Sequence, residues 1–273
     1  MKNVAIVSWY TLKEAMARKV FIFFAAISIL VVIFTAVILG VTNTQSIMTG
    51  LPGKNNLPDI GFIISRLEVM IISPLAGLGL LLAIFASSSF IPVMLEKGNI
   101  DLLLSKPVSR SQLLWGKYLG GILVMFLNIA LLIIGVWLSI SIKFSYWSFT
   151  FLWGILVITF TFAVLYALIV LFGVITKSSM PGMMFAYLIF LILSPLLKLA
   201  HYEMRILISN DFWKSAADAA YYILPKTSEL MGTIILKLAS GETITDYQPV
   251  WSSFLFLTAM MGIGNYVFNK KDF

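Results

Sequence analysis

The dominant feature of this sequence is a series of long apolar runs that contain no charged side chain. About 20 residues, at a rise of about 1.5 Å each, cross a hydrocarbon core of about 30 Å, and a helix pairs its backbone polar groups internally. Six runs reach this length, so we predict an all-α integral membrane protein with six transmembrane helices. The spans are placed at residues 20–40, 69–95, 118–142, 149–175, 178–197 and 247–268.

The composition agrees with a membrane location. Of the 273 residues, 60% are hydrophobic and only 11% are charged, whereas a soluble domain has about 25% charged residues. The formal net charge of +7 does not indicate a nucleic-acid partner, because the basic residues form no cluster on a polar surface.

The basic residues that flank the spans predict the orientation. The N-terminus, segment 96–117, Lys177 and the C-terminal tail share one side if the six spans are real, and that side carries nearly all of the positive excess. The positive-inside rule therefore places both termini in the cytoplasm of a multi-pass protein of the cytoplasmic (inner) membrane. Segment 198–246 becomes an extracytoplasmic loop, which we expect to form short helices because its charges forbid a seventh span.

The segment before the first span, residues 1–19, is expected to form an amphipathic helix in the membrane interface. Its apolar face has these residues: Ile6, Trp9, Leu12 and Met16. Its polar face has these: Thr11, Glu14 and Arg18. A secretory signal is the alternative, but its charged region would be unusually long.

The predicted spans contain no Asp, Glu or His, although a proton-driven transporter needs groups that change charge at membrane depth. Glu68 and Glu96 lie at opposite ends of the second span, where solvation or snorkelling explains them. The predicted spans therefore contain no ionisable residues that could couple transport to an ion gradient.

Catalysis by this chain is not expected either. The sequence has no cysteine and one histidine, His201, which we interpret as an ordinary loop or interface residue. The pairs Gly53-Lys54 and Gly116-Lys117 lack the upstream glycine and the following hydroxyl of a phosphate-binding loop. The serines 87–89 are expected to bond backbone carbonyls, and the methionines to serve packing rather than copper transfer. We assign no catalytic residue, no metal site and no cofactor bound by this chain.

Segment 96–117 is too polar to span a membrane and too apolar for a slack linker. We expect two short helices there, separated by Pro107, with Ser109 or Ser111 capping the second. The first helix would carry a leucine-rich ridge flanked by charged residues: Glu96, Asp101, Lys106 and Arg110. Such a ridge suits docking into a groove on a partner, and a helix that lies passively on the membrane is the alternative.

The same stretch, EKGNIDLLLSKPVSRSQLLWGK, resembles the cytoplasmic signature of ABC type-2 permeases. The N-terminal TLKEAMARK, the six spans and the C-terminal KKDF are similar to that family too, so the resemblance covers essentially the whole chain. The order of features and the sequence YYILPKTSEL are most similar to permeases of the copper-site maturation system for nitrous oxide reductase and to gliding-type permeases.

The resemblance implies a type-V ABC exporter half, with residues 1–273 as a single transmembrane permease domain. It implies a second permease copy, as homodimer or heterodimer, and cytoplasmic ABC ATPase subunits that bind the ATP and Mg. A coupling helix over about residues 98–105 would touch the ATPase through these residues: Glu96, Gly98, Asp101, Leu103, Lys106, Pro107 and Arg110. The N-terminal elbow helix would contribute these: Trp9, Leu12, Glu14 and Arg18.

Three functions stay open on the sequence. The first is the permease of an ATP-driven exporter with an unidentified substrate, in which the ATPases push the Asp101 ridge and tilt the second span. Pro74 and Pro92 could localise bending in that span. The second is an ATP-independent scaffold or scramblase. The third is a component that transmits ATPase work to an extracytoplasmic partner without carrying cargo.

Overall fold

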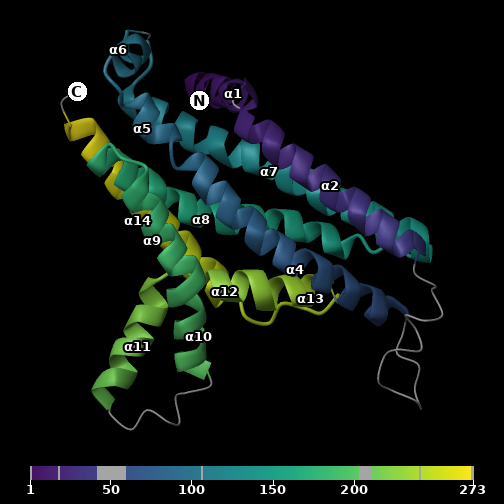
Figure 1. The fold of residues 1–273 in the computed structure, drawn as a ribbon. Helices are drawn as coiled ribbons and strands as arrows, with labels where there is room; N and C mark the ends of the chain where they lie inside the picture. Colours follow the sequence, from purple (N-terminus) through teal and green to yellow (C-terminus); the bar gives the residue numbers. More distant parts are fainter. Residues whose placement is uncertain are drawn as a thin grey trace.

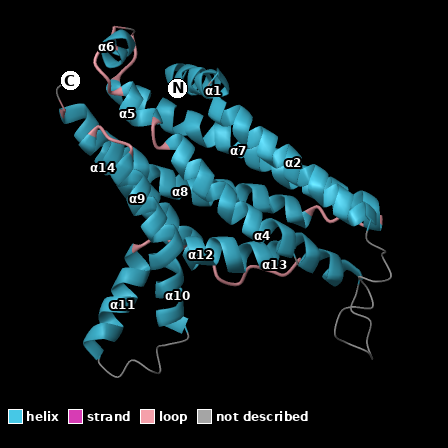
Figure 2. Ribbon diagram, viewed as in Figure 1, coloured by secondary structure: helices cyan, strands magenta, loops and turns pink. Residues whose placement is uncertain are grey.

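The structure of this chain is a computed structural model that describes residues 2–17, 19–41, 60–105, 107–202, 211–239 and 241–271. Helices make up nearly all of these residues, and no strand occurs among them (Figure 2). Six helical segments within the described ranges are long and apolar enough to cross a membrane. The prediction of an all-α membrane protein with six spans is confirmed.

The described residues form a series of helices along the chain. Their bounds are α1 Lys2–Ala17, α2 Lys19–Val41, α4 Ile60–Ser87, α5 Phe90–Met94, α6 Asn99–Leu104, α7 Arg110–Phe144, η1 Thr150–Leu152, α8 Trp153–Thr176, α9 Met180–Leu188, η2 Ile189–Leu193, α10 Ser194–Tyr202, α11 Asp211–Ile223, α12 Thr227–Glu229, η3 Leu230–Ile234, α13 Ile235–Ala239 and α14 Gln248–Lys270. The elements η2 and η3 are π-helical turns.

Helix α8 forms the centre of the bundle. Every residue from 161 to 171 is buried, because α7, α14, α9 and α4 all pack against it. A helix that is apolar on all sides needs such neighbours. Tyr166 of α8 stacks on Tyr118 of α7 with ring centres 5.5 Å apart, and the Tyr118 hydroxyl donates to the Ala163 carbonyl at 2.9 Å. These contacts join α7 to α8.

The two ends of the bundle differ in character (Figure 1). Helix α1, the short helix α6 and the end of α14 gather at one end, which we call the α6 end. Helices α10 and α11 project from the opposite side of the bundle, and α12 and α13 cross beneath α4 and α8. The chain therefore brings its first and its last described residues to the same end.

The second span is interrupted close to the α6 end. Helix α4 ends at Ser87, and α5 begins at Phe90. Pro92 has no backbone N–H, and its ring disfavours a helical carbonyl four residues earlier. The Ser87 and Ser88 hydroxyls donate to carbonyls of the preceding turn at 2.8 Å and 2.7 Å, which confirms the role expected for these serines. Pro74, in contrast, lies inside an unbroken α4.

Glycines allow α1 to approach α7 closely. A Cβ atom on Gly116 would lie 2.5 Å from Val7, and one on Gly120 would lie 2.5 Å from Thr11. Other glycines have open space around them instead. An added Cβ meets nothing within 4 Å at these positions: Gly77, Gly79 and Gly262.

Two alanine substitutions should therefore have opposite effects on stability. In Gly120→Ala the new methyl collides with the Thr11 side chain and the Ser8 carbonyl, so we expect a loss of about 1–3 kcal/mol. In Gly77→Ala the methyl enters open space, so the higher helix propensity should leave stability unchanged or raise it by up to about 1 kcal/mol. Thermal unfolding of both variants in the same detergent measures the difference, and equal shifts would contradict this packing.

Candidate functional site

The N-terminus of α7 is the centre of the α6 end. Ser109 caps the helix by accepting from the Gln112 backbone N–H at 3.2 Å, and the Gln112 side chain accepts from the Ser109 N–H at 3.2 Å. This reciprocal capping box fixes the point at which the loop enters the helix. The prediction that Ser109 or Ser111 caps this helix is confirmed for Ser109.

Helix α1 is attached to this point by side-chain hydrogen bonds. The Asn3 amide donates to the Pro107 carbonyl at 3.2 Å and to the Gln112 side-chain oxygen at 3.1 Å. One turn further, the Ser8 hydroxyl donates to the Gly116 carbonyl at 3.0 Å. These bonds hold α1 against both the loop and the first turns of α7.

An ion pair completes this contact. Lys117 is 8% exposed, and its ammonium lies 2.5 Å from a carboxylate oxygen of Glu14. A buried lysine without a partner would be costly, so Glu14 compensates a charge that α7 places beneath α1. Glu14 thus has a partner within the chain, which the sequence pattern did not reveal.

The buried and exposed faces of α1 differ in part from the apolar and polar faces that the sequence predicted. Leu12 is buried against α7 together with Ala15 and Val124, and Thr11 is buried as well. The predicted apolar face keeps three exposed members: Ile6, Trp9 and Met16. Leu12 is therefore a packing residue, while Trp9 and its neighbours remain on the outside of the bundle.

Arg110 connects the start of α7 to the end of the chain. Its guanidinium donates to the carbonyls of Lys271 at 2.6 Å and Asn269 at 3.4 Å. The Lys271 ammonium donates to the carbonyls of Val174 and Ile175 at 2.8 Å each. Because basic groups satisfy the last carbonyls of a helix, the C-terminal residues join the ends of α8 and α14 to the start of α7.

The turn before α6 is the exposed part of the predicted coupling loop. Gly98 has a φ of +89°, a conformation that glycine adopts without the steric cost of a Cβ. The preceding Glu96 and Lys97 are exposed, as is Asn99 at the start of α6. The Asn99 amide donates to the Val93 carbonyl at 3.1 Å, so this turn is bonded back onto α5.

Two apolar residues of α6 are not part of the free ridge that the sequence predicted. Ile100 is only 2% exposed and belongs to the main hydrophobic core, and Leu103 packs against that core. The reason is that α6 packs on α5 at the end of the second span. The expectation of an exposed ridge is wrong for these two residues, whose burial attaches α6 to the bundle.

The remaining predicted coupling and elbow residues lie as follows. Pro107 is exposed and accepts the bond from Asn3. Lys106 and Arg18 lie outside the described residues, and the Asp101 side chain does too, although its backbone belongs to α6. The structure thus brings Glu14, Pro107 and Arg110 into one connected set of bonds at the α6 end.

Glu68 departs from its predicted environment. It lies inside α4, not at a solvated helix end, and its exposure is 0%. Neither carboxylate oxygen has a hydrogen-bond partner among the residues that the structure describes. The prediction that solvation accounts for Glu68 is wrong, because the helix extends eight residues before it and carries it into the bundle.

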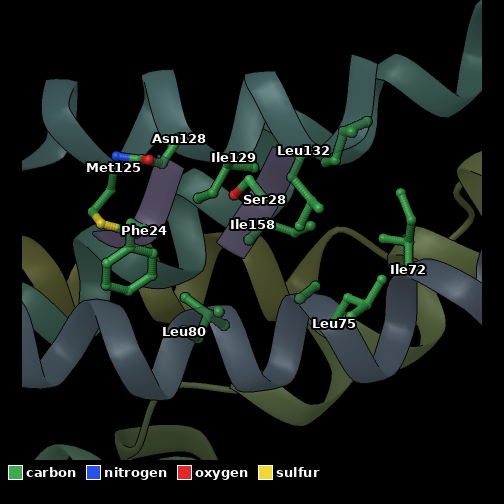
Figure 3. Close-up of a pocket in the computed structure, with 13 residues that line it drawn as sticks. Phe24, Ser28, Ile72, Leu75, Leu80, Met125, Asn128, Ile129, Leu132 and Ile158 are labelled. Atoms are coloured by element: carbon green, nitrogen blue, oxygen red, sulfur yellow. The ribbon is translucent and has the colours of Figure 1, made fainter. Parts of the chain in front are cut away.

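A narrow cavity lies between α2, α4, α7 and α8 (Figure 3). The centre of a water-sized molecule can move within about 30 Å³ of it, which is room for about one or two waters. Its polar atoms come from Ser28 and from Asn128, whose amide donates to Val124 O at 3.1 Å while its side-chain oxygen has no protein partner among the described residues. The other lining residues are apolar, apart from the backbone at Gly79.

The sequence did not predict a polar network between α10, α11 and α12. His201 lies 2.7 Å from Asp218 and stacks on Tyr221 with ring centres 4.1 Å apart. The Tyr221 hydroxyl donates to the Glu229 carboxylate at 2.6 Å and lies 3.1 Å from the Tyr202 hydroxyl. His201 therefore lies at the interface between two helices, one of the two environments expected for it. A pattern of separate aromatic and charged residues gives no local signal for such a network.

Lys226 packs against the Tyr221 ring of this network. It is 3% exposed, its ammonium is 3.6 Å from the centre of the Tyr221 ring, and it donates to the Gln248 side chain. Burial lowers the pKa of Lys226 to about 8, although the nearby Glu229 and Asp246 act in the opposite direction. The folded protein therefore holds this proton less tightly than the unfolded chain does.

A charge exchange should test the ion pair between α1 and α7. We expect Glu14→Ala to cost about 1–3 kcal/mol, because the Lys117 ammonium loses its partner, and the double variant Glu14→Lys/Lys117→Glu to recover part of that loss. The chain has no cysteine, so an Asn3→Cys/Gln112→Cys pair reports α1 docking through disulfide formation. Full cross-linking in Glu14→Ala would show that the pair does not hold α1.

The pKa of Lys226 predicts a pH dependence of stability. A lysine in an unfolded chain has a pKa of about 10.4, so between about pH 8 and pH 10 the unfolded state binds more protons than the folded state. The contribution of Lys226 to stability therefore rises with pH across this interval. Thermal unfolding should show wild type gaining on Lys226→Met from pH 8 to pH 10, whereas parallel curves would contradict it.

The family of the chain follows from its sequence over almost its full length. A family model described as ABC-2 family transporter protein matches residues 5–273, and a comparison with curated proteins finds no match. The match covers all six candidate spans and the α6 end, but it does not distinguish subfamilies, so the similarity to nitrous oxide reductase maturation and gliding-type permeases stays a prediction. The family implies a membrane component of an ABC transporter whose partner is an ABC ATPase. The chain belongs to the ABC-2 transporter family.

Proposed function

We propose that this chain is the permease subunit of an ATP-driven exporter in the cytoplasmic membrane, with the α6 end facing the cytosol. A separate ATPase binds there and hydrolyses ATP, and a second permease copy completes the transport path. The substrate is left open. The observation that carries the proposal is the set of bonds that joins α1, Pro107, the start of α7 and the C-terminal residues. Together with α6, which packs on α5 beside them, they form one unit.

This unit is suited to receive a mechanical push. Its exposed part is the turn around Gly98, whose acidic Glu96 stands next to Lys97. Directly behind the turn, Ile100 is buried in the core and the half-buried Leu103 packs against it. A force on the turn is therefore transmitted to the bundle and not absorbed by a loose loop, since packed cores deform little.

The break between α4 and α5 is the position at which the second span can bend under this force. The second span is interrupted at Ser88 and Ser89, and the five residues of α5 separate this break from the turn around Gly98. Non-helical residues between two rigid segments absorb rotation more readily than an intact helix does. We infer that ATPase closure rotates α5 and α6 against α4 at this break, rather than bending α4 at Pro74.

We infer that α4 and α7 separate near Asn128 when the α5 and α6 segment rotates. The cavity at Asn128 supports this inference. An unsatisfied amide oxygen in an apolar environment costs free energy, and a cargo or water that enters between α4 and α7 would satisfy it. Glu68 does not make a proton relay by itself, because a relay requires a second group that exchanges the proton.

The proposal predicts that charge reversal in the turn around Gly98 and in α6 releases the ATPase. Affinity purification of the tagged full chain from its native membrane should recover an ABC ATPase and ATP hydrolysis in the eluate. In Glu96→Arg/Asp101→Arg both should fall about tenfold or more, because like charges across an interface cost several kcal/mol, while membrane insertion is unchanged.

Glu242→Arg is the matched control, because Glu242 is exposed in the loop between α13 and α14, away from the α6 end. It should retain the ATPase at the wild-type level. Wild-type protein that brings no ATPase from its native membrane would contradict the proposed function, and retention of the ATPase by the double variant would exclude this turn as the contact.

A further inference from the structure

A polar pocket lies on the far side of the bundle from the coupling turn. Its walls come from α10, from the α12–α13 segment and from the loop that leads into α14. The centre of a water-sized molecule can move within about 250 Å³ of it, so the pocket has room for a small ligand and not only for single waters. Its lining residues are Lys198, Tyr202, Glu229, Thr233, Ile234, Lys237, Ile244, Asp246 and Pro249.

The charges of the pocket are balanced and of both signs. Two basic residues, Lys198 and Lys237, line it together with two acidic residues, Glu229 and Asp246. The Lys237 ammonium also donates to the Thr245 hydroxyl at 3.3 Å. Lys198 donates to the Thr233 hydroxyl at 3.2 Å rather than to either carboxylate. Lys226 is close to both acids but is directed to Gln248 and the tyrosine rings and does not line the pocket.

One of these carboxylates is held in place by the network behind it. Glu229 is 5% exposed and accepts from the Tyr221 hydroxyl at 2.6 Å. Tyr221 in turn stacks on His201, which Asp218 holds at 2.7 Å. A buried charge positioned by a supporting set of hydrogen bonds is characteristic of a binding site, because the reorganisation on binding is small.

The balance of charges selects among ligand classes. A simple anion would meet two carboxylates and a simple cation two ammonium groups, so each would gain contacts to one pair and suffer repulsion from the other. A molecule that carries both signs can place each of its charges beside the pair of opposite sign. The apolar Ile234, Ile244 and Pro249 suit a short methylene link between the two charges.

The hydrogen-bond acceptors of the pocket indicate what kind of cationic group the ligand carries. Two carboxylates and the Tyr202 hydroxyl accept hydrogen bonds, which a primary ammonium can donate and a quaternary ammonium cannot. Recognition of quaternary ammonium groups uses cages of several aromatic rings, whereas Tyr202 is the one aromatic residue among those that line this pocket.

We propose that this pocket binds a zwitterion with a primary ammonium and an oxyanion on a short link. Lys198, Lys237 and Thr233 bind the oxyanion, and Glu229, Asp246 and Tyr202 bind the ammonium. The ethanolamine phosphate headgroup of a lipid and a free amine phosphate share this chemistry. The site does not depend on the proposed coupling to an ATPase.

Binding of phosphoethanolamine to the purified full chain in detergent tests the proposal. Calorimetry should show saturable binding that ethanolamine or inorganic phosphate alone does not reproduce. Glu229→Gln keeps an acceptor for Tyr221 but removes the charge, and Lys198→Gln removes one ammonium. Each should weaken binding about tenfold or more, because each variant removes one charged hydrogen-bonding group that contacts the ligand.

Matched controls remove the same charges elsewhere. Lys143→Gln at the end of α7 and Glu242→Gln in the loop before α14 do not line the pocket, so their affinities should equal that of wild type. If Glu229→Gln fails to fold, Lys198→Gln decides the result alone, since Lys198 is partly exposed.

A second measurement identifies the source of the ligand. Native mass spectrometry of protein from nanodiscs should show retention of phosphatidylethanolamine over phosphatidylglycerol and phosphatidylcholine if the ligand is a lipid headgroup, and no such preference if it is a free zwitterion. Absence of phosphoethanolamine binding, equal binding of either half-molecule, or unchanged affinity in Lys198→Gln would overturn the proposal. Each of these outcomes is independent of whether an ATPase is recovered.

Discussion

The close approach of α1 to α7 is the contact on which the α6 end depends. Gly116 and Gly120 remove the side chains that would keep the two backbones apart, and only then can Asn3 reach Pro107 and Glu14 reach Lys117. With α1 displaced, a lysine at the start of a membrane span would lose its counter-charge. The glycines therefore determine the electrostatics as well as the packing of this end.

The bilayer explains why polar interactions gather at the two ends of the bundle. In the hydrocarbon, backbone groups must be satisfied within helices, and side-chain charges are costly. The α6 end uses Arg110 and Lys271 to occupy free helix-terminal carbonyls. The opposite region instead uses a network of aromatic hydroxyls, a histidine and carboxylates, in which Tyr221 is the central member. Burial and the bond to Glu229 raise the pKa of Tyr221, so its hydroxyl keeps its proton and remains a hydrogen-bond donor.

The sequence predicted those features that depend on local pattern. Apolar runs predicted the six spans, the Ser109 signal predicted the start of α7, and the serines before Pro92 predicted bonds to the preceding turn. Each of these depends on residues within a few positions of one another. The sequence could not show that Ile100 is buried or that Arg110 bonds the end of the chain, because both depend on residues far apart in sequence.

The sequence by itself determined that the chain forms a helical membrane protein and which segments cross the bilayer, because hydrophobicity and helix length act locally along the chain. Only the tertiary structure decided which polar residues meet. It carried Glu68 into the bundle, paired Glu14 with Lys117, and placed Glu229 beside Lys198 in one pocket. Such partners are set by the way the helices pack in three dimensions, and a hydropathy pattern contains no record of that packing.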